Sequence, residues 1–348
     1  MKRMHGGDPT AFVESRGFAP LDFSANISPL GVPEGVRKAI ADAAPESDRY
    51  PDPNCRALCA AVAAREGVPE DRVLCGGGAA DLIWRSALAL KPKRALLAAP
   101  CFSEYEAALK AVECEILFHP LAEPFVLTER ILPEIDRRPD LLILCNPNNP
   151  TGRTIEPELL RRIVRRCEEN AVRLMVDECF LDFLDEPERH TLKALLESCS
   201  HLLILRAFTK FFGMAGVRLG YALCADRAFL DAVDGSGPPW SVSVPAQAAG
   251  LAALRERDYP ERLRSLIRTE RPRLKKELET LGLKVIPGEA NFLLFFCAAP
   301  LEEALRNRGI LIRSCTDFRG LNENWYRAAV RAPEDNARLA AALREILT

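Results

Sequence analysis

The segment Arg206-Ala-Phe-Thr-Lys-Phe-Phe-Gly-Met-Ala-Gly-Val-Arg-Leu-Gly220 directly follows an apolar run, Leu202 to Leu205, that is typical of a buried strand. Lys210 in this segment has two interpretations. In the first it is a solvated loop lysine. In the second it lies in a partly apolar pocket, where desolvation lowers its pKa and frees the amine for imine chemistry. Arg218 would then supply the fixed positive charge that a phosphorylated cofactor needs. The choice depends on whether the rest of the chain supplies further cofactor contacts.

Length and composition exclude several classes of protein. At 348 residues the chain can bury a large core, and we expect two closely joined domains. Its 47 basic and 49 acidic residues nearly balance and only 7% of residues are aromatic, so we expect neither nucleic acid nor a membrane as partner. Residues 1–7 lack the apolar region of a signal peptide, and no apolar run reaches the roughly 18 residues of a membrane helix. We therefore expect a soluble cytoplasmic protein.

Twelve cysteines and four histidines do not form a metal-binding pattern. There is no Cys-x-x-Cys, the nearest pair is Cys55 and Cys59, and the histidines are scattered along the chain. Most of the other cysteines lie within or beside apolar runs, where cysteine acts as a small hydrophobic residue. We expect reduced, structural thiols and no metal.

Strand-length apolar runs alternate with helical patterns from residue 72 onward. The expected strands are 72–75, 95–99, 114–118, 141–145, 174–176 and 202–205, and the expected helices between them include 82–90, 103–112 and 156–170. Continuous apolar strands that alternate with helices indicate a mostly parallel sheet covered on both faces. The sequence therefore predicts an α/β fold.

Three regions are expected along the chain. Residues 1–30, rich in Gly and Pro and without periodicity, form an extended arm over the active site, and residues 31–240 form the large domain. Residues 241–348 form a smaller α+β domain after the break at Pro238-Pro239-Trp240. The segments expected in this smaller domain are a helix at 259–281, strands at 290–296, 309–313 and 326–330, and a final helix at 333–347.

Several candidate ligand-binding segments directly follow strands, and ligands of such sheets bind at the carboxyl ends of the strands. Gly76-Gly77-Gly78 before a helix offers free N–H groups to an anion, or simply makes a turn. Asp177 is either a partly buried carboxylate that needs a cation or an ordinary helix N-cap. Asn146-Pro-Asn-Asn-Pro-Thr-Gly152 is too specific for a generic loop.

Together these motifs resemble the fold-type I pyridoxal phosphate enzymes of the class I/II aminotransferase family, in the family's order and over essentially the whole chain. The resemblance implies that Lys210 is catalytic and carries the cofactor covalently. It also implies that Asp177 pairs with the pyridine nitrogen, Asn149 binds the ring 3-oxygen, and Phe102 stacks on the ring.

The resemblance further implies a homodimer with shared active sites, in which Tyr50 reaches the cofactor of the second subunit. The residues that it assigns to the cofactor phosphate are Gly78, Ala79, Ala80, Thr209 and Arg218.

The chain departs from the family pattern at three places. Phe180 stands where many relatives carry a tyrosine beside the 3-oxygen, so that hydrogen bond is expected to be absent. Ala207 replaces a frequent phosphate-binding serine, and Gly77 and Ala79–Ala80 replace more polar residues of the phosphate loop. These changes would weaken cofactor binding without altering the fold.

Within the family, the chain is similar to the threonine-phosphate decarboxylases of cobalamin biosynthesis, which are themselves similar to histidinol-phosphate aminotransferases. This similarity implies that His5, Asn26 and Arg313 line the substrate-phosphate end, while Arg327 binds the α-carboxylate and Asn149 also contacts substrate. If the arm is only a loop, His5 is part of a poorly ordered terminus and Asn26 is a turn residue. The stretches that carry this similarity are His5-Gly-Gly, Asp22-Phe-Ser-Ala-Asn-Ile-Ser-Pro-Leu-Gly31, Arg49-Tyr-Pro-Asp, Pro239-Trp-Ser-Val and Gly309-Ile-Leu-Ile-Arg-Ser-Cys315.

Three activities follow as hypotheses. The first is decarboxylation of L-threonine O-3-phosphate to (R)-1-amino-2-propanol O-2-phosphate, with serine phosphate as a variant substrate because one methyl group gives only about 1–3 kcal/mol of discrimination. The second is amino transfer between histidinol phosphate and 2-oxoglutarate. The third, a non-catalytic regulator, would need a DNA-binding module, for which the residues before Asp22 are too few.

Overall fold

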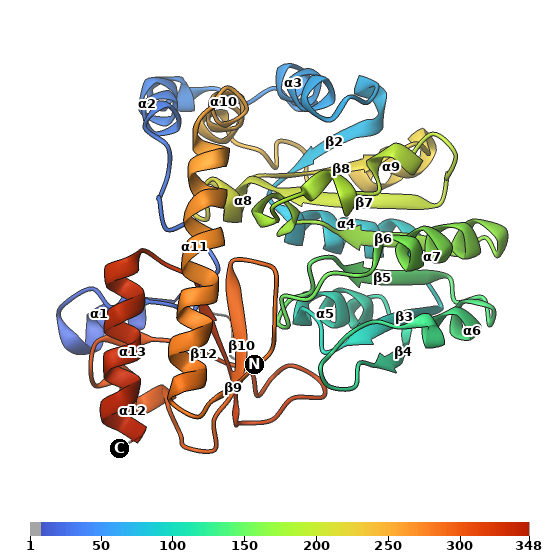
Figure 1. Cartoon of the computed structure of the whole chain (residues 1–348). Helices are drawn as coiled ribbons and strands as arrows, with labels where there is room; N and C mark the ends of the chain where they lie inside the picture. The colour runs from blue at the N-terminus through green and yellow to red at the C-terminus, as the bar shows by residue number, and fades with distance from the viewer. Residues whose placement is uncertain (1–7, 348) are drawn as a thin grey trace.

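A seven-stranded sheet organises the larger part of the molecule (Figure 1). The structure, a computed structural model, describes residues 8–347. The strand order is β2-β8-β7-β6-β5-β3-β4, and β8 alone runs antiparallel to its neighbours in this sheet. The predicted mostly parallel sheet is thus confirmed. Its strands are β2 (Val73–Gly76), β3 (Arg94–Ala99), β4 (Glu115–Pro120), β5 (Leu141–Cys145), β6 (Arg173–Asp177), β7 (Leu202–Ala207) and β8 (Gly220–Cys224).

Strand β8 is the member of this sheet that the sequence did not predict. Its short apolar run lies directly behind the motif that contains Lys210, and it pairs with both β2 and β7. Gly220 permits this position, because a Cβ there would lie 2.8 Å from the backbone nitrogen of Ala79 and from the carbonyl oxygen of Arg206. A side chain at this point would push the sheet away from Ala79, where helix α4 begins.

Alternate residues of the central strands enter two different cores. In β5, Leu142 and Leu144 belong to one hydrophobic cluster, whereas Leu141, Ile143 and Cys145 belong to the other. This period of two explains the continuous apolar runs, since both faces are covered by helices. One face packs on α4 (Ala79–Leu90), α5 (Ser103–Ala111) and α9 (Arg227–Gly235), and the other on α7 (Pro157–Glu169).

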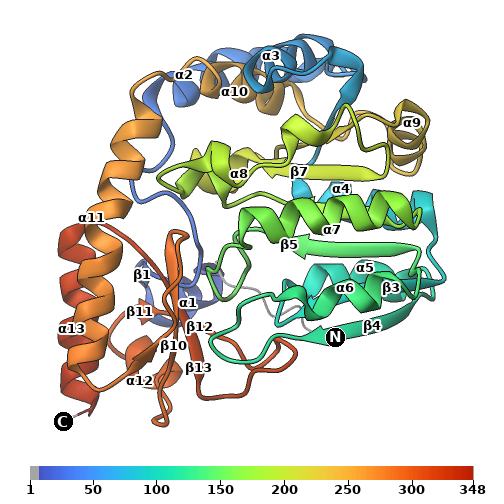
Figure 2. The same ribbon diagram turned by 45° about the vertical axis from the view of Figure 1, so that its right-hand side comes forward.

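The smaller sheet is antiparallel and has the order β12-β13-β10-β9. The expected strand 309–313 is two strands in different sheets, because Ile310 and Leu311 pair with the N-terminal segment while Arg313 and Ser314 pair with β13. Helices α11 and α13 lie side by side against this sheet in both views (Figure 2). The elements are β9 (Lys284–Val285), β10 (Phe292–Phe296), β11 (Ile310–Leu311), β12 (Arg313–Ser314), β13 (Trp325–Ala329), α11 (Tyr259–Thr280), α12 (Glu302–Arg306) and α13 (Pro333–Leu347).

Further helices cover the upper end of the large sheet in Figure 1, where α10 packs against α2. The domain boundaries at residues 30 and 240 stay predictions. The remaining helices are α2 (Glu34–Ala43), α3 (Arg56–Glu66), α6 (Leu132–Ile135), α8 (Phe208–Phe211) and α10 (Val244–Ala253), with 3-10 turns at Ala44–Asp48, Glu70–Arg72, Glu129–Ile131, Leu181–Phe183, Pro187–Arg189 and Lys193–Leu195.

The N-terminal segment is more ordered than the expected extended arm. It contains helix α1 (Thr10–Arg16), which buries Phe12 and ends at Gly17 with φ 77°. Strand β1 (Leu21–Asp22) then pairs in parallel with β11. The sequence did not predict α1, because a seven-residue helix has too little periodicity to stand out beside Gly and Pro.

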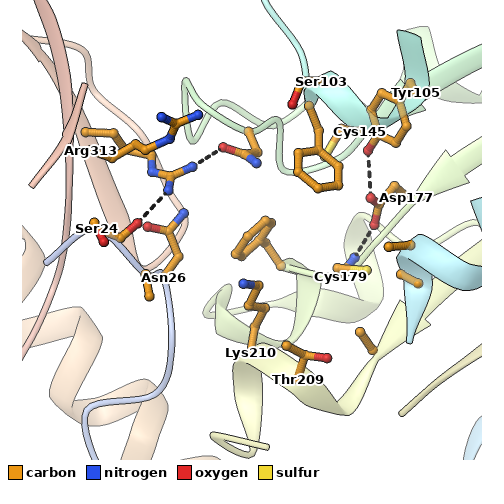
Figure 3. Close-up of a pocket in the computed structure, with 18 of the residues that line it drawn as sticks. Ser24, Asn26, Ser103, Tyr105, Cys145, Asp177, Cys179, Thr209, Lys210 and Arg313 are labelled. Carbon is orange, nitrogen blue, oxygen red and sulfur yellow. Dashed lines mark hydrogen bonds between the residues drawn. The ribbon is translucent and has the colours of Figure 1, made fainter. Parts of the chain in front are cut away.

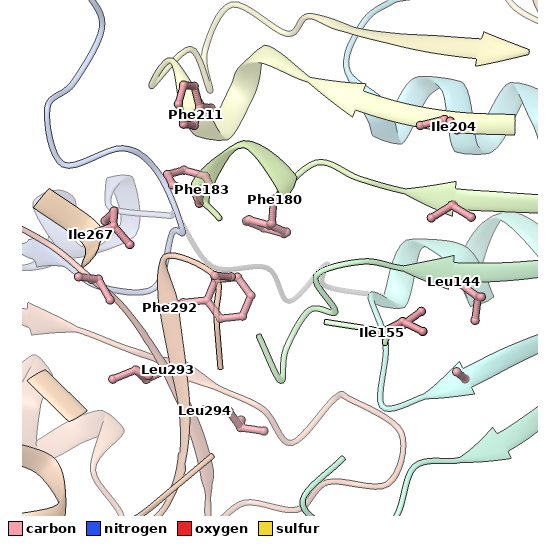
Figure 4. Packing of buried hydrophobic residues seen from close by; sticks show 14 of the residues in the cluster. Leu144, Ile155, Phe180, Phe183, Ile204, Phe211, Ile267, Phe292, Leu293 and Leu294 are labelled. Atoms are coloured by element: carbon pink, nitrogen blue, oxygen red, sulfur yellow. The ribbon is translucent and has the colours of Figure 1, made fainter. Parts of the chain in front are cut away.

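Phenylalanines join the two sheets across the centre of the molecule (Figure 4). The ring of Phe292, on β10, lies 5.0 Å from that of Phe180, which follows β6, and Phe183 lies 5.2 Å from Phe211 on α8. These contacts fix the small sheet against the turn that carries Lys210. Phe180, the departure from the family pattern, therefore belongs to this packed cluster.

Two wider features concern all of residues 8–347. None of the helices described is both long and apolar enough to cross a membrane. All twelve cysteines lie in this part of the chain as free thiols, and no group of three His, Cys, Asp or Glu side chains within it could hold a metal ion.

Candidate active site

A cavity of about 200 Å³ opens at the carboxyl ends of the large-sheet strands, where the small sheet and the N-terminal segment meet them. Figure 3 shows Lys210 and Thr209 on one side and Arg313, Ser24 and Asn26 on the other. The residues that line the cavity are Ser24, Ala25, Asn26, Ala79, Ala80, Phe102, Ser103, Tyr105, Cys145, Asn149, Asp177, Cys179, Phe180, Ala207, Thr209, Lys210, Arg218, Arg313, Phe318 and Arg327.

Lys210 lies in this cavity and not on the outer surface. Strand β7 ends at Ala207, and α8 buries Phe208 and Phe211, so Lys210 is left on the cavity side of the turn. The backbone N–H of Ser28 donates to the Lys210 carbonyl at 2.9 Å. Burial, reinforced by the charge of Arg327, lowers the pKa of the Lys210 amine to about 8. A substantial fraction of the amine is therefore neutral near physiological pH.

Asp177 presents a buried carboxylate at the end of β6, with only 5% of its surface exposed. Its Oδ2 accepts a hydrogen bond from the Tyr105 hydroxyl at 2.6 Å, and its Oδ1 accepts one from the Cys179 N–H at 3.0 Å. Within residues 8–347 it forms no ion pair with Arg or Lys. The carboxylate thus shapes the turn after β6 and still lacks the cationic partner that burial demands.

Tyr105 was not predicted as a site residue, although it stands in the same sequence stretch as Phe102. The two side chains come from neighbouring turns around the start of α5, and their rings meet edge to face at 5.7 Å. The spacing of three residues is the signal that could have paired them, because residues i and i+3 share a helix face. Phe102 forms an aromatic wall of the cavity, and Tyr105 holds Asp177 behind it.

The amino end of α4 forms a second polar corner. Gly78 precedes this helix with φ 98°, and a Cβ there would lie 2.9 Å from Nη2 of Arg218. Ala79, Ala80, Thr209 and Arg218 all line the cavity here. Backbone N–H groups at a helix start, an arginine and a hydroxyl together suit a phosphate group.

Two buried arginines line the same cavity from the small sheet. Arg313 and Arg327 are directly paired across strands β12 and β13, which places both guanidinium groups on one face of that sheet. Arg327 donates to Oδ1 of Asn149 and, at 2.9 Å, to the carbonyl oxygen of Ser24, while its buried Nε has no hydrogen-bond partner in the described part of the chain. Burial lowers the pKa of Arg327 to about 10.

Asn26 is buried within the N-terminal segment and lines the cavity beside these arginines. Its Oδ1 has no hydrogen-bond partner among residues 8–347. Asn26 is thus a buried residue outside the helices and strands, and its contact with substrate stays a prediction. An unsatisfied buried amide at this position is consistent with a ligand that supplies a donor.

Two of the predicted site residues that the structure describes, Tyr50 and Gly78, do not line the cavity, and a third, His5, lies outside the described residues. Tyr50 is 77% exposed and stacks on Trp240 with ring centroids 4.5 Å apart, and Gly78 lies just behind the cavity wall. The lining residues that the sequence did not single out are Ser24, Ala25, Ser103, Tyr105, Cys145, Cys179 and Phe318.

Comparisons with known proteins agree with this geometry. The family Aminotransferase class I and II matches residues 19–346. The chain is 38% identical to threonine-phosphate decarboxylase of Salmonella typhimurium, over 99% of this chain and 96% of the relative, and 32% identical to histidinol-phosphate aminotransferase of Methanosarcina mazei, over 92% and 87%.

A solved structure shows the same architecture. The histidinol-phosphate aminotransferase from Clostridium acetobutylicum superposes with a TM-score of 0.88 at 29% identity, covering 93% of this chain and 98% of that protein. The match extends over both sheets, and the family matches nearly the whole sequence. The chain therefore belongs to the aminotransferase class I and II family and is a fold-type I enzyme.

Proposed function

We propose that the cavity holds pyridoxal 5'-phosphate and that the enzyme decarboxylates L-threonine O-3-phosphate to (R)-1-amino-2-propanol O-2-phosphate and CO2, for assembly of the cobalamin nucleotide loop. The observation that carries this proposal is the pair Arg313 and Arg327, which face the same cavity as Lys210. Two fixed cations suit a substrate with two anionic groups, an α-carboxylate and a phosphate.

The residues present fit the cofactor. Asp177 is a buried carboxylate without an Arg or Lys ion pair in the described chain, which suits a protonated pyridine nitrogen. Phe102 offers a ring face, and Asn149 lies where it could reach a ring oxygen. The phosphate would be held at the N-terminus of α4 by Ala79, Ala80, Thr209 and Arg218.

The bound cofactor would supply an electron sink for the bond that breaks at the substrate Cα. Arg327 would hold the α-carboxylate and Arg313 the phosphate, and together they would set which Cα bond stands perpendicular to the conjugated plane. If that bond is the one to the carboxylate, CO2 leaves. The ammonium form of Lys210, whose pKa is lowered to about 8, would then donate one proton to Cα at the position that the carboxylate has left.

Amino transfer from histidinol phosphate is the alternative, and relatives with that name support it. Histidinol phosphate has a phosphate but no carboxylate, so Arg327 would bind only the 2-oxoglutarate of the second half-reaction. In the decarboxylase both arginines bind one substrate at once, which uses the cavity more completely. Serine phosphate stays an alternative substrate, since it has the same two anions.

We also propose a homodimer in which Tyr50 completes the active site of the partner subunit. An exposed tyrosine stacked on an exposed tryptophan is a surface that a second subunit could cover.

The test is a product assay on the purified enzyme loaded with pyridoxal 5'-phosphate. Threonine phosphate is supplied without any oxo acid, and CO2 and the primary-amine phosphate are measured. We expect both products in equal amounts from the wild type and neither from Lys210→Ala. Glutamate formation that requires both histidinol phosphate and 2-oxoglutarate, with no CO2 from threonine phosphate, would instead establish the aminotransferase.

A further inference from the structure

The two arginines of the cavity have different partners. Arg327 donates to two uncharged acceptors, Asn149 Oδ1 and Ser24 O, and forms no ion pair with a carboxylate in residues 8–347. Arg313, in contrast, donates through Nη2 to the Oδ2 of Asp317 at 2.6 Å. A carboxylate of the protein itself therefore occupies one of the two anion-binding arginines.

The backbone around Asp317 is held by contacts that do not involve its side chain. The Phe318 ring is buried against the cavity, and the Phe318 N–H donates to the Cys315 carbonyl at 3.0 Å. The next residue, Arg319, pairs with Glu106 of α5 at 2.9 Å and lies over the ring of Phe118. These contacts tie the turn to the large domain.

The Asp317 side chain is nevertheless 24% exposed. Because the turn is anchored on both sides, the carboxylate can leave Arg313 by side-chain rotation alone, toward solvent. Displacement by an incoming anion then needs no movement of the small sheet.

Charge decides what such a displacement does to affinity. A phosphate that approaches Arg313 must replace Asp317 or lie beside a like charge, and either outcome weakens its binding. A ligand that also carries an α-carboxylate gains a second contact at Arg327, which compensates for the binding free energy lost at Arg313. A ligand that carries only a phosphate has no such compensation and binds weakly.

We propose that Asp317 is a specificity-determining residue, an internal anion that competes with phosphate for Arg313 and so makes tight binding depend on a second anion at Arg327. This inference rests on the proposed function of the cavity as an amino-acid phosphate site. Decarboxylation removes the carboxylate and leaves the phosphate on the product. Asp317 then returns to Arg313, which favours release of the product and keeps inorganic phosphate from blocking the site.

The first test is calorimetric titration of the cofactor-loaded enzyme with inorganic phosphate, since the cofactor's own phosphate then fills the corner at α4. We expect Asp317→Asn to lower the phosphate Kd about three- to tenfold, as removal of a partly exposed competing charge would. The inhibition constant of the amine-phosphate product, which also lacks the carboxylate, should fall by a similar factor. Arg313→Gln added to Asp317→Asn should abolish the gain.

Asp335→Asn is the matched control. Asp335 pairs with Arg331 at 2.9 Å with the same four-residue spacing and is 19% exposed, but Arg331, unlike Arg313, does not line the cavity. Phosphate affinity should be unchanged in that variant. An unchanged or higher phosphate Kd in Asp317→Asn would overturn the proposal, because a residue that merely positions Arg313 would weaken phosphate binding when neutralised.

The phosphate titration involves no catalytic turnover. If the wild type releases no CO2 from threonine phosphate but Asp317→Asn binds phosphate more tightly, the proposed reaction is wrong and the competition at Arg313 stands. If the wild type releases CO2 but Asp317→Asn gains no phosphate affinity, the proposed reaction stands and the competition at Arg313 is wrong.

Discussion

Lys210 shows how one amine is prepared for chemistry by its surroundings. The short helix α8 leaves its side chain in the cavity, and the chain that precedes α2 is hydrogen-bonded to its carbonyl through Ser28. Burial and the neighbouring guanidinium of Arg327 both disfavour the ammonium form, so the pKa falls to about 8 from the ordinary 10.5 of lysine. Below pH 8 the amine is mainly protonated and unreactive, and above pH 8 it is mainly neutral.

We therefore predict that Lys210 in the cofactor-free enzyme reacts with acetic anhydride in proportion to a titration with a midpoint near pH 8. Competitive labelling followed by mass spectrometry measures this for each lysine in one sample. Lys38, whose side chain is 74% exposed, is the internal control for reaction with the reagent. A Lys210 midpoint close to the ordinary lysine value of about 10.4 would contradict the desolvated pocket.

Residue-scale prediction from the sequence succeeded where a motif names the residue and failed where a contact depends on the fold. Lys210, Asp177 and Arg327 stand in recognisable segments, and the structure brings them to one cavity. Tyr105 and Asp317 were not singled out by any sequence motif. Their partners, Asp177 and Arg313, come from other strands or from across a turn, and only the three-dimensional arrangement reveals them.

At the scale of elements, a buried ion pair ties the ends of two central strands together. Arg206 of β7 pairs with Glu178, directly after β6, at 2.9 Å, and neither side chain is appreciably exposed. Arg206 also contacts the Thr191 hydroxyl at 3.1 Å. Burial raises the pKa of Glu178, while the Arg206 charge opposes that rise. The pair holds the strand end that leads into Lys210.

We predict that Arg206→Leu lowers the free energy of unfolding by about 3–5 kcal/mol, because it leaves Glu178 buried without its cation. The double variant Arg206→Leu with Glu178→Leu should recover part of this loss, since no fully buried charge is then left unpaired; Asp182, the other carboxylate partner of Arg206 at 3.4 Å, is 24% exposed to solvent. Urea unfolding followed by circular dichroism measures both. The exposed pair Arg227–Asp231 is the control, and Arg227→Leu should leave the midpoint unchanged. A double variant no more stable than Arg206→Leu alone would contradict this account.

Elements were predictable where their hydrophobic pattern is local. The apolar runs of β5 and β7 and the long helix α11 were expected within a few residues of their bounds. Helix α1 and strand β8 were not, because each is short and lies beside a stronger signal. The division of 309–313 into two strands depends on which partners each half meets, and no local pattern contains that information.

The whole molecule builds its cavity from parts far apart in the sequence. The large sheet supplies Lys210 and Asp177, the small sheet supplies the paired arginines, and the N-terminal segment supplies Ser24 and Asn26. Strand β1 pairs with β11, which joins the N-terminal segment to the chain directly before β12 of the small sheet. The remaining exposed aromatic pair, Tyr50 with Trp240, is the feature that the proposed dimer would use.

A subunit-mixing experiment tests whether Tyr50 acts in the active site of the partner subunit. We predict that Lys210→Ala and Tyr50→Ala proteins, each poorly active alone, regain about a quarter of wild-type activity when unfolded and refolded together, because half of the randomly formed dimers contain one complete site. The sample is then separated by size to confirm the dimer. Activity no higher than the sum of the separate variants would show that Tyr50 does not act in the partner's site.

The most direct measurement is a competition in a single tube. Equal amounts of threonine phosphate and histidinol phosphate are given to the cofactor-loaded enzyme with 2-oxoglutarate, and the phosphate compounds are followed by phosphorus NMR while CO2 is trapped. We predict that threonine phosphate is converted to aminopropanol phosphate with one CO2 for each molecule, while histidinol phosphate persists and no glutamate appears. Consumption of histidinol phosphate with formation of glutamate, while threonine phosphate persists, would contradict the proposed decarboxylase.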